Sequence, residues 1–311
     1  MVGCSFDATN RTIVECKQMA CLREGHRKIH RSWLFSTSGF VFFRRTPKFF
    51  RLMRAFFHSE IQKIKSAAQT LDRQTAFILT SSVFLVFIQL TMGTKRFYLQ
   101  YVAAHISPQW QELGEWVWWF GLQGVTGFVL PILFLVLFFR QKPAEMGLGL
   151  GDWKLASAIA SAYIPLVIIG TWILSNGADF QGMYPHFSPA AKDWRLFLLY
   201  EGFFIFYWFG WEYLWRGYVL FGTAKTLGYW AIFVQMIPFA ILHADKPLAE
   251  AFLSVLGGLA LGALCWRTRS FWIAIPIHAA QMLILDFWCS LRIRTGASGI
   301  GLSALMKVLG F

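Results

Sequence analysis

Charged residues are scarce in this chain. Asp, Glu, Lys and Arg make up only 14% of its 311 residues, whereas hydrophobic residues make up 56% and aromatic residues 18%. A soluble domain usually carries about 25% charged residues, because they cover its surface. The mean hydropathy of +0.49 and the long apolar runs are instead typical of a membrane protein. The composition therefore argues against an ordinary soluble domain.

Cysteines are also few. The chain has five of them, an odd number, so a disulfide framework is not expected. Cys16, Cys21, His26 and His30 are of the types that bind zinc, but the gap between the two pairs is far shorter than a zinc-finger loop requires. The sequence therefore predicts no metal and no cofactor.

Acidic residues are sparse, and the basic excess is concentrated near the N-terminus. The formal net charge is +13, and residues 1–75 hold fourteen Lys and Arg against five Asp and Glu, a net charge of +9. Basic and aromatic residues are interleaved in RRTPKFFRLMRAFF, residues 44–57. Such a segment either binds anionic lipid at the membrane surface or is a solvated cytoplasmic tail. No nucleic-acid fold motif accompanies the charge, so nucleic acid is not an expected partner.

Seven apolar runs are candidates for membrane-spanning helices, for which a bilayer requires about 20 residues. They are residues 76–93, 116–139, 155–175, 196–222, 228–243, 248–266 and 270–289. The sequence thus predicts an all-α, polytopic membrane bundle of seven or eight transmembrane helices, in the cell (inner) membrane. The basic N-terminus predicts an inside start, which puts Lys142 and Arg267 on one membrane side.

The pattern divides the chain into three regions. Residues 1–75 are a basic tail, cytoplasmic or interfacial, residues 76–294 are the transmembrane domain, and residues 295–311 are a short C-terminal tail. The first three apolar runs contain no ionisable side chain other than Tyr163. A charge at the bilayer centre costs at least about 2.5 kcal/mol, so the charged residues of the last four runs indicate the functional half, within residues 196–290.

Glu212 and Arg216, in the segment WEYLWRG, are four residues apart and share a helix face. Glu before Arg is the favourable order for an ion pair on a helix. The pair is either a structural ion pair or a carboxylate held ionised so that it can take a proton from water. The two residues alone leave both interpretations open.

Two histidines lie on later runs. His243 ends an apolar helix in FAILHADKP, where a single histidine is more often structural than catalytic. His278 begins a polar helix face in IPIHAAQMLILD. The other members of that face are Gln281, Met282 and Asp286. Such a face is either a polar stripe that holds helices together or part of a site.

Depth along the helices favours a shared site. At 1.5 Å per residue, Glu212 and His278 lie about 15 and 13 Å from loops on the same membrane side, near the midplane. His243 lies about 22 Å from the start of its run, somewhat deeper. Three ionisable residues on three helices therefore converge roughly in depth.

The ordered set of motifs resembles the CPBP group of intramembrane endopeptidases, which includes CAAX prenyl proteases, bacteriocin-processing proteins and Abi-like proteins. That family carries Glu-Glu-x-x-x-Arg, then Phe-x-x-x-His, then His-x-x-x-Asn or Asp on successive membrane helices. This chain offers Glu212 to Arg216, Phe239 to His243, and His278 in the same order. The segment KPAEMGLGLGDW, residues 142–153, also resembles the family's lead-in.

The resemblance implies a glutamate-type peptidase. In the family the first Glu and the first His activate water, and the second His and the Asn form the oxyanion hole. Two positions depart from this pattern, because Trp211 stands at the first Glu and Met282 at the Asn. Adjacent helix residues point about 100° apart, so Glu212 is not an automatic substitute for Trp211. The other motif residues are intact, which favours a subfamily with a single Glu.

The predicted function is hydrolysis of a peptide bond within the membrane, in a membrane protein or lipidated peptide substrate. Glu212 is the predicted general base, and His243 orients the water. His278 is expected to stabilise the oxyanion. The predicted catalytic residues are Glu212, His243 and His278. The predicted supporting residues are Arg216, Gln281 and Asp286. Arg216 holds Glu212, and either Gln281 or Asp286 replaces the missing Asn.

Three other functions stay open. Glu212, His243 and His278 could be ligands of a catalytic zinc, although the chain has no H-E-x-x-H helix. The same fold could be a non-catalytic membrane binding or immunity module, which the residues at 211 and 282 favour. A transporter could relay protons through intramembrane Glu, His and Asp, but the two halves of the chain differ, and many transporters have internal repeats.

Overall fold

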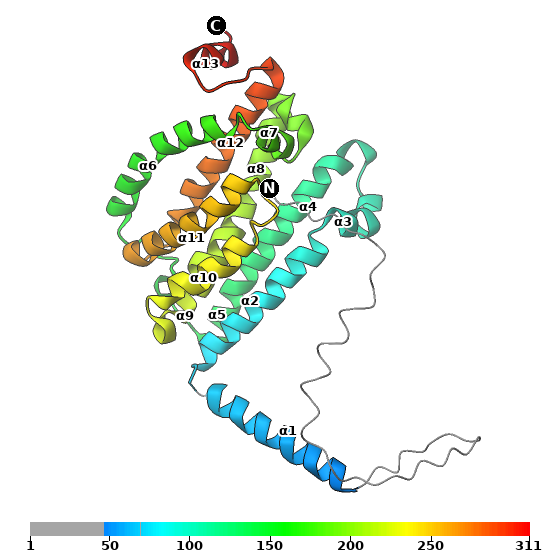
Figure 1. Ribbon diagram of the computed structural model, residues 1–311, viewed down its shortest axis with the longest axis vertical. Helices are drawn as coiled ribbons and strands as arrows, with labels where there is room; N and C mark the ends of the chain where they lie inside the picture. Colours follow the sequence, from blue (N-terminus) through cyan, green and yellow to red (C-terminus); the bar gives the residue numbers. More distant parts are fainter. Residues whose placement is uncertain (1–46, 69) are drawn as a thin grey trace, which may run out of the picture. The chain divides into compact units, whose positions relative to one another are not determined.

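The computed structural model describes residues 47–68 and 70–311, and this part of the chain is helical without any strand (Figure 1). The predicted all-α class is therefore confirmed. The chain divides into two units, residues 1–59 and 60–311, and the candidate site lies entirely in the second. The predictions for the cysteines and histidines of residues 16–30, and for the basic tail up to residue 46, lie outside the described residues.

The first described helix, α1 (Pro47–Ala68), covers the end of the predicted basic tail. Its basic Arg51 and Arg54 and its apolar Leu52 and Phe56 are all exposed. Helices that combine basic and large apolar exposed side chains are typical of the membrane interface. Binding of this helix to anionic lipid stays a prediction.

The second unit contains the remaining helices. Two of its long helices contain a π-helical stretch, at Val125–Val129 between α4 and α5 and at Tyr213–Val219 between α8 and α9. The helices are α2 (Arg73–Met92), α3 (Lys95–Tyr101), α4 (Gln111–Gly124), α5 (Leu130–Phe139), α6 (Trp153–Leu174), α7 (Ala178–Met183), α8 (Trp194–Glu212), α9 (Leu220–Leu227), α10 (Trp230–Ile241), α11 (Leu248–Thr268), α12 (Ala274–Thr295) and α13 (Leu302–Leu309).

Among the described residues, five helical stretches are long and apolar enough to cross a membrane, and they match five of the seven predicted runs. They are Arg73–Met92, Pro108–Phe139, Trp153–Leu174, Leu248–Thr268 and Ala274–Thr295. The predicted run 196–222 lies in the continuous helix from α8 to α9, whose charged residues lower its hydropathy. The run at 228–243 forms only the 12-residue α10. The chain is an integral membrane protein with five supported spans, and the count of seven or eight stays a prediction.

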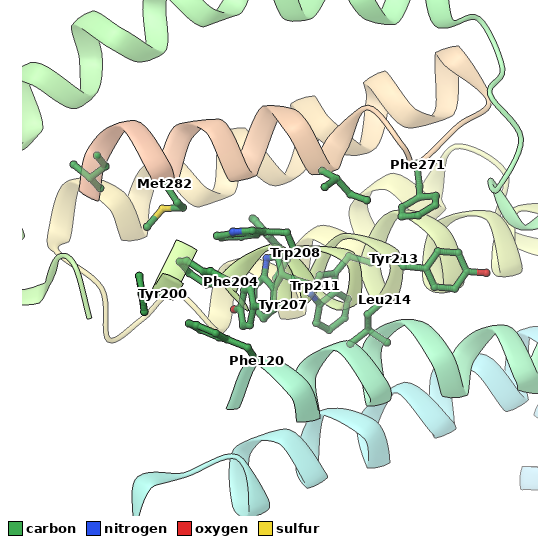
Figure 2. Close-up of a cluster of buried hydrophobic side chains, with 14 of the residues drawn as sticks. Phe120, Tyr200, Phe204, Tyr207, Trp208, Trp211, Tyr213, Leu214, Phe271 and Met282 are labelled. Carbon is green, nitrogen blue, oxygen red and sulfur yellow. The ribbon is translucent and has the colours of Figure 1, made fainter. Parts of the chain in front are cut away.

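Helix α8 packs against both α4 and α12 (Figure 1). Helix α8 lies close to the helix formed by α4 and α5 at two glycines, Gly210 on α8 and Gly127 between α4 and α5. A Cβ on either residue would collide with the backbone of the other helix. Glycine is required at such a contact because it has no Cβ. Between these helices lies a cluster of aromatic side chains from α8 (Figure 2), namely Tyr200, Phe204, Tyr207, Trp208 and Trp211.

The loop that follows α5 is tied to the turn between α11 and α12. The backbone N–H of Asp152 donates to the carbonyl oxygen of Thr268 at 2.8 Å, and that of Phe271 donates to Gly147 at 2.9 Å. The two loops therefore lie at the same end of their helices. This arrangement agrees with the prediction that the second and sixth predicted runs end on one membrane side.

The C-terminal tail forms the short helix α13. Its buried Ala304 and Val308 pack with Trp172 of α6. The guanidinium of the buried Arg292, on α12, lies 3.8 Å from the centre of the Trp172 ring. The tail is thus held against the ends of α6 and α12, and α13 is too short to span a bilayer.

Candidate active site

Glu212 and Arg216 form the predicted ion pair. Glu212 is the last residue of α8, and Arg216 lies one turn later in the π-helical stretch. The Nη1 atom of Arg216 lies 3.3 Å from Oε1 and 3.2 Å from Oε2 of Glu212, and both side chains are fully buried. The guanidinium also lies 4.0 Å from the centre of the Phe239 ring of α10. A buried carboxylate and its cation are thus held together between two helices.

His278 of α12 joins this pair. Its Nδ1 atom lies 2.6 Å from Oε1 of Glu212. A carboxylate oxygen accepts, so we assign the Nδ1 hydrogen to this bond. The Nε2 atom of the ring is then left for the cavity that His278 lines. The structure therefore brings two of the three predicted catalytic residues into direct contact.

His243 follows α10 and is held by a backbone group. Its Nδ1 atom lies 2.7 Å from the carbonyl oxygen of Phe239, which can only accept. The ring therefore carries a hydrogen on Nδ1, and in the neutral form its Nε2 atom is an acceptor. The rings of His243 and His278 are nearly parallel, with planes 17° apart and centres 6.5 Å apart. The predicted convergence of the two histidines is present in the structure.

Both histidines line a cavity of about 300 Å³ between α6, α10, α11 and α12. Gln281 also lines it, and its Oε1 accepts from the Tyr163 hydroxyl at 3.3 Å. A second cavity of about 30 Å³ lies against both histidines and the aromatic residues of α8. Glu212 is not among the described residues that line either cavity, so its carboxylate lies behind His278.

The two positions that depart from the family motif flank the histidines. The ring of Trp211 lies 5.7 Å from that of His243, centre to centre. Met282 lines both cavities beside His278. Figure 2 shows the indole of Trp211 and the thioether of Met282 at this aromatic cluster. An indole and a thioether thus stand where the family has a carboxylate and an amide.

Asp286 lies elsewhere. It is fully buried, and the charged groups that act on its carboxyl group are Glu201 of α8, Lys246 and Glu250. Eight residues at 100° each turn it about 80° around the helix from His278, which accounts for its different neighbour. Among the described residues, Asp286 is not one that lines either cavity. The structure therefore brings Gln281 to the histidines but not Asp286.

A second polar group near the histidines was not among the site residues predicted from the sequence. Glu250, in the first turn of α11, lines both cavities, and the Tyr184 hydroxyl lies 2.8 and 2.7 Å from its two oxygens. The Nζ atom of Lys246 lies 3.1 Å from Nε2 of His186 at the smaller cavity. The sequence signal for Glu250 was an acidic residue inside a predicted membrane span. Helix periodicity could not relate Glu250 to His243, because a loop separates their helices.

The described residues contain no group of three or more His, Cys, Asp or Glu that could hold a metal ion. Glu212 is instead hydrogen-bonded to His278 and paired with Arg216. His243 directs one ring nitrogen to a backbone carbonyl. Glu212, His243 and His278, the three proposed zinc ligands, are thus close together, but each already has a hydrogen-bond partner within the protein.

Comparison with known proteins gives one match. Residues 193–284 match the family described as Type II CAAX prenyl endopeptidase Rce1-like. No curated protein and no solved structure matches the chain. The matched segment runs from the start of α8 into α12 and contains Glu212, Arg216, His243 and His278. The resemblance predicted from the motifs is thereby confirmed over residues 193–284, which are similar to the type II CAAX prenyl endopeptidase Rce1-like family of the CPBP group.

Proposed function

We propose that this protein hydrolyses a peptide bond within the membrane, using a water activated by histidines that a buried glutamate supports. One observation carries the proposal. His278 is fixed by the buried pair of Glu212 and Arg216, and it lines the same 300 Å³ cavity as His243. Hydrolysis requires water beside the reacting groups, and a cavity lined by two imidazoles provides room for it.

His243 is the proton acceptor in this mechanism. Its Nδ1 hydrogen is committed to the Phe239 carbonyl, so its Nε2 atom can accept a proton from water. The water oxygen attacks the carbonyl carbon of the substrate while its proton passes to His243. The tetrahedral intermediate then collapses, the C–N bond breaks, and His243 returns the proton to the leaving nitrogen. The products are a carboxylic acid and an amine.

His278 stabilises the oxyanion. Glu212 accepts its Nδ1 hydrogen at 2.6 Å, and in its imidazolium form the ring presents an Nε2 hydrogen as a donor to the oxyanion. Gln281 adds amide N–H donors from the same cavity. Arg216 pairs with Glu212 and holds its carboxylate in place. Glu212 thus acts through His278, whereas the sequence alone favoured direct contact between Glu212 and the water.

The substrate is an apolar or lipidated segment of a membrane-bound protein. Beside its few polar groups, the larger cavity is lined by Leu253, Leu256 and Leu261 of α11 and by Leu285 of α12. Apolar walls with a few polar groups suit a chain that enters from lipid. We further propose that the protein resides in the cell (inner) membrane, with its basic N-terminal segment against anionic lipid.

A cleavage assay tests the proposal. The full chain, reconstituted in nanodiscs, is given a quenched fluorescent peptide that carries a prenylated cysteine. We expect cleavage by the wild type and a loss of at least about 100-fold in kcat for His243→Ala and for His278→Ala. The control is His105→Ala, which should leave kcat unchanged because His105 is exposed and lines neither cavity. Full activity of both cavity variants would place hydrolysis elsewhere.

The non-catalytic alternative is favoured by the residues at two family positions, Trp211 and Met282. It predicts that the wild type binds the same peptide without cleaving it, which fluorescence anisotropy would detect. The zinc alternative predicts that phenanthroline abolishes cleavage and that added zinc restores it. We expect cleavage to survive the chelator, because Glu212 is bonded to His278 and Arg216.

A further inference from the structure

The cavity of about 30 Å³ beside the histidines has room for about one water molecule. It is lined by ionisable groups from five parts of the chain. They are His186 from the segment between α7 and α8, Tyr207 from α8, His243 and Lys246 from the α10–α11 loop, Glu250 from α11, and His278 from α12. A water held there has three imidazoles, a phenol, an ammonium group and a carboxylate around it. Such a site offers the two to four polar partners that a buried water needs.

Glu250 is the carboxylate of this cavity. It lies in the first turn of α11, seven residues after His243, and its side chain is half-buried. The Tyr184 hydroxyl lies within 2.8 Å of both carboxylate oxygens and holds the group in place. Glu250 also lines the larger cavity. One carboxylate thus reaches both spaces that the two histidines share.

Glu212 differs from Glu250 in this respect. The Glu212 side chain is fully buried, and its oxygens contact His278 and Arg216. Glu212 lies behind His278 and is not among the described residues that line either cavity. Trp211, which lines the smaller cavity, has an indole and no carboxylate. Among the described residues, Glu250 is therefore the carboxylate that lines both cavities beside the histidines.

We propose that Glu250 is a further catalytic residue, which accepts a hydrogen bond from the attacking water while His243 accepts the other. This proposal rests on the proposed function. With both hydrogens of the water held, the oxygen lone pair is left for the substrate carbonyl carbon. The proton that leaves the water passes to Nε2 of His243, and the negative charge of Glu250 stabilises the imidazolium that forms. Glu250 is unchanged at the end of the reaction.

The test is Glu250→Gln in the prenylated peptide assay with the full chain in nanodiscs. The amide keeps the shape and one acceptor oxygen but has no charge. We expect kcat to fall by on the order of 100-fold with little change in KM, because the group acts on the water and not on the substrate. Tyr184→Phe, which removes only the hydroxyl that holds Glu250, should lower kcat by a smaller factor. Glu112→Gln is the matched control, since Glu112 also lies in the first turn of a helix and is exposed.

The outcomes separate this proposal from the proposed function. If the wild type cleaves, His243→Ala does not, and Glu250→Gln keeps full kcat, the role of Glu250 is wrong and the function stands. A rise in KM with unchanged kcat would also overturn the role, because it would make Glu250 a substrate-binding group. If the wild type cleaves no peptide, both proposals fail together. A normal melting temperature for Glu250→Gln shows that a loss of kcat does not come from unfolding.

Discussion

The Nδ1 atom of His278 lies 2.6 Å from Oε1 of Glu212, and the contact joins α12 to α8 through buried groups. Arg216 contacts the same carboxylate, so one glutamate serves two partners. The carboxylate of Glu212 therefore has two roles. It neutralises the buried charge of Arg216, which stabilises the fold, and it holds the His278 imidazole that acts in catalysis. These two effects can be separated by variants that remove one charge or both.

Glu212→Gln should abolish cleavage and also destabilise the fold. The amide keeps a hydrogen-bond acceptor but leaves the Arg216 charge buried and unpaired, which costs about 3–5 kcal/mol. The double variant Glu212→Gln, Arg216→Met removes both charges and should recover most of that stability while staying inactive. The free energy of unfolding in mixed micelles and kcat are measured for both. Recovery of kcat in the double variant would show that Glu212 has only a structural role.

Gln281 and Asp286 should differ in their effect on catalysis. Gln281 lines the cavity, and its Oε1 accepts from Tyr163, so its amide N–H groups remain as donors. We expect Gln281→Leu to lower kcat by about 10–100-fold, somewhat less than the loss of a main oxyanion donor. Asp286→Asn should leave kcat nearly unchanged, because Asp286 is not among the described residues that line either cavity. The reverse order of effects would mean that Asp286 reaches the reacting groups during turnover.

The pairing of Glu212 with Arg216 and the approach of the histidines could be predicted from the sequence. Helix periodicity fixes which residues of one helix share a face, and the rise per residue fixes their depth. These two rules suffice for an ion pair four residues apart and for a rough match of depth between helices. The all-α class follows equally well, because only helices bury their backbone groups within so many apolar runs.

The details that depend on helix rotation could not be predicted. Depth does not say whether Glu212 faces a cavity or lies behind His278. The spacing of Asp286 from His278 looks like one face, yet it turns the side chain toward α8 and Glu201. Glu250 reaches the histidines through a loop, and loop geometry carries no periodic signal. Rotation and loop paths are set by packing, which a single sequence does not display.

Asp72 should make the stability of the bundle depend on pH. It caps α2 through the backbone N–H groups of Gln74 and Thr75, at 2.9 and 3.0 Å, and it also contacts the hydroxyl of Thr226. Burial raises the pKa of Asp72, but the hydrogen bonds from Thr75 and Gln74 and the charge of Lys225 lower it more, so the pKa lies below its ordinary value.

A carboxylate with a lower pKa in the folded state stabilises the fold at pH values above its unfolded pKa. That contribution is lost as the pH falls through the folded pKa. Asp72→Ala should therefore cost about 1 kcal/mol at pH 7, as expected for a lost helix cap, and much less at pH values below the folded pKa of Asp72. Thermal unfolding in detergent at several pH values measures the difference. The exposed Asp245→Ala is the control, and an equal cost of Asp72→Ala at every pH would contradict the capping role.

Reporters fused after Lys142 and after Arg267 should fall on one side of the membrane. Lys142 lies in the loop after α5 and Arg267 in the last turn of α11, and a backbone hydrogen bond of 2.8 Å between Asp152 and Thr268 joins these two segments. A separation across the bilayer would break these bonds. Paired alkaline phosphatase and fluorescent protein fusions give the side for each position. Opposite sides for the two fusions would show that the arrangement of α5, α11 and α12 is wrong.

Met282→Asn should raise the rate of cleavage. Met282 lines both cavities beside His278, at the position where the family has an amide that completes the oxyanion hole. An asparagine there adds an N–H donor aimed at the developing negative charge, and such donors are worth about 10²–10³ in kcat. The gain will be smaller, about tenfold, because the site was not built around the amide. Met282→Leu has nearly the same volume and no donor, so it is the matched control and should leave kcat unchanged. A lower kcat for Met282→Asn at an unchanged melting temperature would mean that the oxyanion does not form beside His278.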